Sequence, residues 1–270
     1  DVTVQVADGN GGTDTQAIAV TVTNVNEAPV ITSDGAGAAA TRNAAENGTA
    51  VTTVTATDVD AATTLTYSIS GGADAAKFAI NSSTGVLTFV SAPDFEVPTD
   101  IGGNNVYDVT VQVSAGAFTD TQGIAVTVTN VNESPVITSD GGGTTASVSA
   151  AENQTAATTV ASTDVDGGAP SYSIVGGADA ALFTINASTG VLSFVAAPNF
   201  EAPADAGGNN VYDVTVQVAD GNGGTDTQAI AVTVTSVNDN APVITSDGGG
   251  ATATANVAEN QTTVTTVVAT

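Results

Sequence analysis

The chain has 270 residues, with 28 acidic side chains against only two basic ones, Arg42 and Lys77, and a formal net charge of -26 at pH 7. This charge excludes binding to nucleic acid and to anionic membrane surfaces, because both need Lys and Arg to displace their counterions, and it attracts cations. The apolar content of 41% is enough to build cores, so we expect a folded chain.

The sequence repeats with a period of about 106 residues. The string DVTVQV occurs three times, starting at Asp1, Asp108 and Asp213, and PVITSDG occurs three times, starting at Pro29, Pro135 and Pro242. We therefore expect an excerpt from a longer array with four parts: residues 1–27, the last two strands of an upstream repeat (repeat A); 28–133, a complete repeat (B); 134–240, a complete repeat (C); and 241–270, the first strands of a downstream repeat (D).

Alternating apolar and polar residues predict the strands of each repeat. In chain order, repeat B has such patterns at residues 29–31, 54–56, 65–69, 78–80, 86–89, 107–113 and 124–128. The segment 72–77 is at most one short helical turn. About seven short antiparallel strands, rich in Thr and Val and separated by Gly, Asn and Asp turns, predict an all-β fold. We expect seven-stranded Greek-key, immunoglobulin-like sandwiches arranged in tandem as a linear rod.

The sequence has no run of about 18 apolar residues, and residue 1 opens directly on a strand pattern. We therefore expect neither a membrane span nor a signal peptide in this segment.

Acidic residues recur at fixed positions of the repeats. Repeat B has Ala45-Glu46-Asn47, Asp58-Val59-Asp60 and Asp94-Phe95-Glu96, and repeat C has Ala151-Glu152-Asn153, Asp164-Val165-Asp166 and Asn199-Phe200-Glu201. Three linkers, at residues 24–29, 130–135 and 236–242, are rich in Asn and acidic residues and end on Ala-Pro or Ser-Pro.

In this order the motifs resemble the cadherin repeat. The resemblance rests on Glu-Asn near the first strand, Asp-x-Asp followed by Tyr-Ser-Ile, Phe-x-Ile with Thr-Gly-x-Leu, Asp-x-Glu, Tyr-x-x-Thr-Val-Gln, and Val-Asn-Asp-Asn-Ala-Pro in the third linker. It covers essentially the whole chain. The Thr-, Ala-, Gly- and Val-rich composition with Val-Asn-Glu-Ala-Pro linkers is similar to the repeats of large bacterial secreted adhesins of the RTX, type I-secreted kind.

The resemblance implies Ca²⁺ at the inter-repeat junctions, held by the lower end of one repeat, the linker, and the upper end of the next. The implied ligands are Asn26, Glu27, Asp58 and Asp60 at the A/B junction; Glu46, Asp94, Glu96, Asn132, Glu133, Asp164, Asp166 and Asp220 at B/C; and Glu152, Glu201, Asn238, Asp239 and Asn240 at C/D. The chemistry agrees independently, because Ca²⁺ takes oxygen ligands and a chain without His or Cys is a poor host for zinc or copper.

Three departures from the pattern stand out. Asn199 replaces the first aspartate of the Asp-x-Glu motif, and the first two linkers are one residue shorter than the third. Ala115 occupies the position at which repeat C has Asp220.

The same residues also have plainer interpretations. An acidic cluster can be a solvated face, but here the charges recur at motif positions. The segment 220–226 lacks the distal Glu of an EF-hand and is interpreted as a turn between strands, Asp220 excepted. The glycine runs at residues 141–143 and 248–250 are followed by neither a helix nor a Lys, so they predict loops and not phosphate sites.

The sequence predicts no enzyme, since it has neither His nor Cys and no Gly-x-Ser-x-Gly elbow. The first expectation is a calcium-rigidified stalk of an extracellular or cell-surface adhesin. The alternative is a self-associating extracellular fibre or sheath whose repeats contact other copies of the same protein, with Phe118 as the one suggestive exposed aromatic. A third possibility, that the repeats themselves recognise a ligand, has no surface to nominate. The expected partners are neighbouring repeats of the same chain, with no nucleic acid and no membrane insertion.

Overall fold

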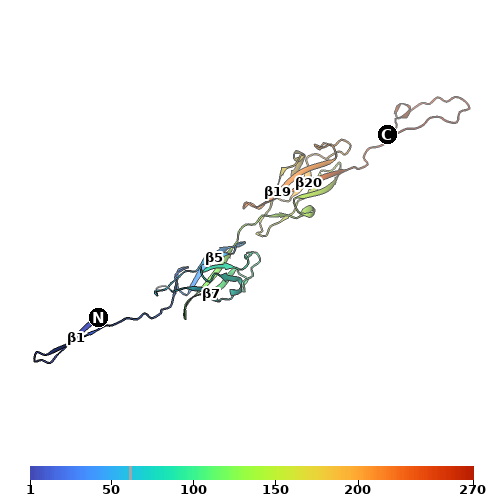
Figure 1. Ribbon diagram of the computed structural model, residues 1–270. Helices are drawn as coiled ribbons and strands as arrows, with labels where there is room; N and C mark the ends of the chain where they lie inside the picture. Colours follow the sequence, from blue (N-terminus) through green and yellow to red (C-terminus); the bar gives the residue numbers. More distant parts are fainter. Residues whose placement is uncertain (61–62) are drawn as a thin grey trace. The chain divides into compact units, whose positions relative to one another are not determined.

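The computed structural model describes residues 1–60 and 63–270 (Figure 1). Contacts within the chain divide it into two units, Asp1–Val131 and Asn132–Thr270. Each unit contains one complete β-sandwich and is described here by itself.

The first unit begins with an antiparallel hairpin of β1 (Val2–Ala7) and β2 (Thr13–Ile18), both exposed over their whole length. The described residues of the sandwich that follows contain a short 3-10 turn, η1 (Ala75–Lys77), and the strands β3 (Val30–Ile31), β4 (Ala39–Ala45), β5 (Ala50–Thr53), β6 (Ala56–Thr57), β7 (Thr66–Gly71), β8 (Phe78–Ile80), β9 (Val86–Phe89), β10 (Val106–Ala115) and β11 (Phe118–Thr129).

The second unit repeats this order. Its elements are β12 (Val136–Ile137), η2 (Ser139–Gly141), β13 (Thr145–Ala151), β14 (Ala156–Thr159), β15 (Ser162–Thr163), β16 (Ser171–Gly176), η3 (Ala180–Leu182), β17 (Phe183–Ile185), β18 (Val191–Phe194), β19 (Val211–Ala219), β20 (Thr225–Thr235) and η4 (Ser246–Gly248). Beyond β20, an isolated bridge joins Ile244 to Ala269.

Each sandwich has two layers. One is a four-stranded sheet in the order β4-β11-β10-β7, in which β4 runs parallel to β11 and the other pairs are antiparallel. The other combines the sheet β5-β9-β8 with the pair β3-β6. The second unit has the same arrangement, with β13-β20-β19-β16 facing β14-β18-β17 and β12-β15. The prediction of all-β immunoglobulin-like sandwiches is confirmed, with β4 and β5 added to the predicted strands.

The core lies between the two layers, because the alternating apolar side chains of the strands point inward. Tyr107, Val109, Val111 and Val113 of β10 are all buried, while the residues between them face outward. The Tyr107 ring meets Phe89 edge-on at 5.3 Å between centroids, and Phe89 stacks on Phe78 at 4.7 Å. Such aromatic pairs give each small sandwich much of its apolar contact area.

The Thr-Gly-x-Leu motif has a backbone reason. Gly85 has φ +71°, and a Cβ at this position would overlap the carbonyl oxygen of Val54. The Gly85 carbonyl accepts the Val54 N–H at 2.8 Å, which ties the β8–β9 turn to the end of β5. Only glycine combines that conformation with so close an approach.

Candidate metal centre

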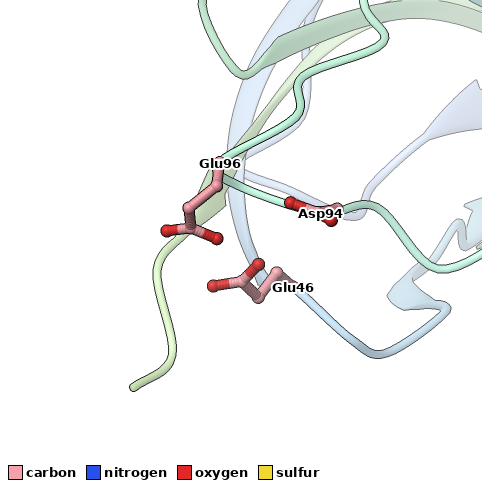
Figure 2. A group of neighbouring side chains, drawn as sticks. All are labelled: Glu46, Asp94 and Glu96. Atoms are coloured by element: carbon pink, nitrogen blue, oxygen red, sulfur yellow. The ribbon is translucent and has the colours of Figure 1, made fainter. Parts of the chain in front are cut away.

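The first acidic cluster consists of Glu46, Asp94 and Glu96 and lies where the first sandwich ends. Glu46 directly follows β4 and is only 4% exposed. Its carboxylate accepts the N–H of Phe95 at 2.7 Å and the N–H of Val131 at 2.7 Å. Because Asp94 and Glu96 flank Phe95, these contacts bring three carboxylates together, with one oxygen from each lying within 4.8 Å of the others (Figure 2).

Further contacts fix the two carboxylates that come from the loop after β9. The Asp94 side chain accepts the N–H of Val97 at 2.9 Å, which closes a short turn. Glu96 accepts a hydrogen bond from the side-chain amide of Asn130 at 2.9 Å. Asn130 was not among the predicted ligands, although the Asn-Val-Asn shared by the first two linkers was a usable signal.

The second acidic cluster consists of Glu152, Glu201 and Asp239, again with one oxygen from each within 4.8 Å of the others. Glu152 is 1% exposed and accepts the N–H groups of Val237 at 2.7 Å and Phe200 at 2.8 Å. These two hydrogen bonds hold the pKa of Glu152 below its ordinary value, and the one from Val237 has the larger effect. Glu152 is therefore anionic at neutral pH.

Asn199 and Asp239 show how the second cluster differs from the first. Asn199 closes the same turn as Asp94, by accepting the N–H of Ala202 at 3.0 Å, but it brings no charge. The third carboxylate comes instead from Asp239 in the linker, whose Oδ2 accepts the Asn153 side-chain amide at 2.6 Å. Asn238 and Asn240, the other predicted ligands of this linker, flank Asp239 and are exposed.

A second group of predicted ligands gathers where the chain enters the first sandwich. Asp60 accepts the N–H of Glu27 at 2.8 Å, and its own N–H donates to Oδ1 of Asp58 at 2.8 Å. The side-chain amide of Asn24 and the Glu27 N–H hold the pKa of Asp60 below its ordinary value. The side-chain amide of Asn26 donates to the Glu27 carbonyl at 3.0 Å. Oδ2 of Asp58 is buried and has no hydrogen-bond partner among the described residues.

The second sandwich has the same arrangement at its entrance, with one addition. Asp166 accepts the N–H of Glu133 at 2.6 Å, and Asp164 accepts the N–H of Asp166 at 3.0 Å. Asp220 adds a third carboxylate, which accepts the Asn132 side-chain amide at 2.7 Å. That bond, followed by backbone N–H groups of the next turn, lowers the pKa of Asp220.

These donor sets fit Ca²⁺. Every candidate ligand is a carboxylate or an amide, and backbone N–H groups donate hydrogen bonds to the two most buried carboxylates, those of Glu46 and Glu152. Three carboxylates so close together repel one another, and a divalent cation would convert that repulsion into attraction. The buried, unpartnered oxygen of Asp58 is of the kind that a cation would satisfy. The predicted ligands thus assemble, within each unit, into an entrance group and an exit cluster.

Comparisons with known proteins agree with this architecture. A cadherin domain family model matches residues 38–131, and a bacterial Ig domain model matches residues 132–233. Protocadherin Fat 1 of Homo sapiens is 30% identical over 258 residues, covering 90% of this chain and 5% of that protein. Protocadherin Fat 4 of Homo sapiens is 36% identical over 165 residues, covering 57% of this chain and 3% of that protein. The chain thus spans only a small part of these curated relatives.

Solved structures give the same fold. Human CDH23 EC21-23 matches with a TM-score of 0.54 and 21% identity, covering 90% of this chain and 80% of that one. Mouse Cadherin-23 EC22-24 matches with a TM-score of 0.54 and 20% identity, covering 91% and 78%. Among the described residues, no helix has the length and apolarity needed to cross a membrane.

Proposed function

The chain consists of cadherin-like tandem repeats, and from this premise we propose that it is a calcium-rigidified segment of the stalk of a cell-surface or secreted adhesin. It is not an enzyme. We propose that its immediate partners are neighbouring repeats of the same chain and that it is located outside the cell.

The observation that carries the proposal is the position of the acidic groups relative to the linkers. In the first sandwich, Asp60 binds the backbone of Glu27 in the linker before it, and Glu46 binds the backbone of Val131 in the linker after it. Carboxylates therefore hold the chain at both the entrance and the exit of a repeat. A cation bound there would fix the linker directions, because it would draw linker and repeat oxygens together.

The residues proposed to hold Ca²⁺ at the exit of the first sandwich are Glu46, Asp94 and Glu96. At the exit of the second they are Glu152, Glu201 and Asp239, with Asn238 and Asn240 beside them. At the entrances they are Asn26, Glu27, Asp58 and Asp60 in the first unit, and Asn132, Glu133, Asp164, Asp166 and Asp220 in the second. When bound, the ion supplies positive charge and oxygen coordination, and the residues supply its position.

Thermal melting of the 270-residue chain in millimolar calcium and in chelator tests the binding part of the proposal. Extracellular modules bind Ca²⁺ with Kd of about 10⁻⁴ to 10⁻³ M. Each occupied site then stabilises the fold by about 1.4 kcal/mol at a calcium concentration ten times its Kd. We expect a higher midpoint in calcium, with a smaller gain for Glu46→Gln. A midpoint that is the same in both buffers would reject calcium binding.

A self-associating fibre is the second candidate function, and one side chain favours it. Phe118, at the β10–β11 turn of the first sandwich, is 45% exposed, whereas every other Phe and Tyr side chain of the described residues is buried or half-buried. Electron microscopy of the intact assembly separates the candidates. Isolated rods support the stalk, and laterally bonded arrays support the fibre.

A further inference from the structure

The loop after β9 has no regular secondary structure, yet it carries both Asp94 and Glu96. Its middle residue, Phe95, is fixed at both of its polar backbone groups. The Phe95 N–H donates to Glu46 at 2.7 Å, and the Phe95 carbonyl accepts the side-chain amide of Asn105 at 2.8 Å. Because Asp94 and Glu96 are the chain neighbours of Phe95, these two hydrogen bonds fix the backbone positions from which both acidic side chains extend.

Asn105 is itself held in place from two sides. Its N–H donates to Asp100 at 3.0 Å, and its carbonyl accepts the N–H of Val128 at 2.8 Å. Val128 lies in β11, the strand that leads into the linker and to the Val131 N–H bound by Glu46. Asn105 therefore ties the acidic loop to the strand that carries the linker, without belonging to the acidic cluster.

The second sandwich repeats the arrangement. The Asn210 side-chain amide donates to the Phe200 carbonyl at 3.0 Å, its N–H donates to Asp205 at 3.0 Å, and its carbonyl accepts the Val234 N–H at 2.8 Å. The motif here begins with Asn199 in place of an aspartate, so the contact does not depend on that charge.

We propose that Asn105 and Asn210 are positioning residues for the calcium sites, acting through Phe95 and Phe200 on the flanking carboxylates. This inference rests on the proposed function. A loop already held in the binding conformation does not have to be ordered when the ion arrives, so the affinity is higher. Residues that orient metal ligands without touching the metal typically change its affinity by about 10- to 100-fold when they are replaced.

The test follows the backbone amide resonances of Phe95 and Phe200 by NMR while the whole chain is titrated with Ca²⁺. Each of these amides donates to the central glutamate of one cluster, so each reports one site. Asn105→Gly removes the side chain without backbone strain, since φ is +62° at this position. We expect its midpoint at Phe95 to move to roughly ten-fold higher calcium, with the midpoint at Phe200 unchanged.

Asn210→Gly is the matched control, since it removes the same contact from the other repeat, where φ is also +62°. It should shift the midpoint at Phe200 and leave that at Phe95 unchanged. Asn105→Asp keeps the size of the side chain but faces the Phe95 carbonyl with an oxygen. It should weaken binding despite its added negative charge, an outcome that a purely electrostatic role cannot give.

Two results would overturn the inference while leaving the proposed function intact. One is wild-type titration at Phe95 in Asn105→Gly, and the other is an equal shift of both amides in either glycine variant, which would indicate general destabilisation. If neither amide of the wild-type chain responds to Ca²⁺, the proposed function itself fails.

Discussion

Four consecutive residues with positive φ follow β3 in the first sandwich, and the same turn follows β12 in the second. The first turn comprises Asp34, Gly35, Ala36 and Gly37, and the second comprises Asp140, Gly141, Gly142 and Gly143. A fully buried glutamine closes each turn, with the Gln122 side-chain amide 3.0 Å from the Gly37 carbonyl and that of Gln228 3.1 Å from the Gly143 carbonyl. The glycine run predicted only as a loop is thus a defined left-handed turn.

Position three of this turn gives a matched pair of substitutions. Ala36 has φ +58° and Gly142 has φ +66°, a region that costs a residue with a Cβ about 1–2 kcal/mol. A Cβ at Gly142 would meet the Ile137 carbonyl oxygen at 3.5 Å and the Thr138 Cα at 4.0 Å, both ordinary contacts, so the cost is conformational. Gly142→Ala should therefore destabilise its sandwich by about 1 kcal/mol, and Ala36→Gly should stabilise the other by somewhat less. Urea unfolding in calcium measures both, and a stabilising Gly142→Ala would contradict this account.

Asp100 and Asp205 are expected to make the free energy of unfolding depend on pH in the acidic range. Burial raises the pKa of Asp100, but backbone N–H groups, those of Asn104 and Asn105 first, outweigh it and hold the pKa below the ordinary 3.8. The same groups act on Asp205. A carboxylate whose pKa is lower in the folded state stabilises the fold fully above its unfolded pKa, and this contribution is lost as the pH falls through the folded pKa.

Asp100→Asn should therefore cost about 1–2 kcal/mol at neutral pH in chelator. It should also flatten the loss of stability as the pH falls below the ordinary carboxyl pKa of 3.8. Unfolding free energies measured across that range check both effects. A variant that loses stability in acid as steeply as the parent would show that Asp100 is not the responsible group.

At the scale of elements, strand alternation was a reliable guide. The predicted segments 78–80 and 86–89 coincide with β8 and β9, and 107–113 lies within β10, because large apolar residues recur at every second position of each. β4 escaped prediction because Ala39–Ala45 contains no large apolar residue, and it exists through parallel pairing with β11. Pairing with a distant strand leaves no local periodicity to detect.

The candidate site, like the strands, could be predicted in part from the sequence. The acidic residues could be named because they recur in register, and both exit clusters assemble from named residues. The residues that hold them could not be named so easily. Asn105 reaches Phe95 through a loop that lacks periodicity, and its role depends on a left-handed backbone that the sequence does not specify uniquely.

The two sandwiches differ at the turn between their last two strands. In the second sandwich, Asp220 accepts the Asn132 amide and backbone N–H groups of its own turn, whereas Ala115 in the first is buried and offers a methyl group. We expect Asp220→Ala to weaken calcium binding at the second entrance by roughly ten-fold or more, since a proposed ligand and one hydrogen-bond partner of the Asn132 amide are lost together. Calorimetric titration measures this change.

The reciprocal substitution is the control. Ala115→Asp should tighten calcium binding at the first entrance. Identical isotherms for Ala115→Asp and its parent would show that the absence of a carboxylate at Ala115 costs the first entrance no calcium affinity.

At the scale of the whole molecule, the composition and the positions of the motifs lead to the same expectation about cations. Twenty-eight acidic side chains with two basic ones leave almost no internal counterions, and the motifs place many of these charges at the entrance and exit of each sandwich. Cations must therefore come from solution. Because the proposed ligands connect linkers to repeats and do not fill a core, calcium should act on the relative arrangement of the repeats more than on the fold of each one.

Small-angle X-ray scattering of the 270-residue chain, in millimolar calcium and in chelator at the same ionic strength, tests this claim most directly. The account predicts one extended form in calcium, with a larger radius of gyration and a narrow distribution of shapes. In chelator, repulsion within the acidic clusters should release the linkers and broaden that distribution, while circular dichroism still shows folded sandwiches. Superimposable scattering profiles in the two buffers would contradict the account, because they would mean that the linkers are stiff without calcium.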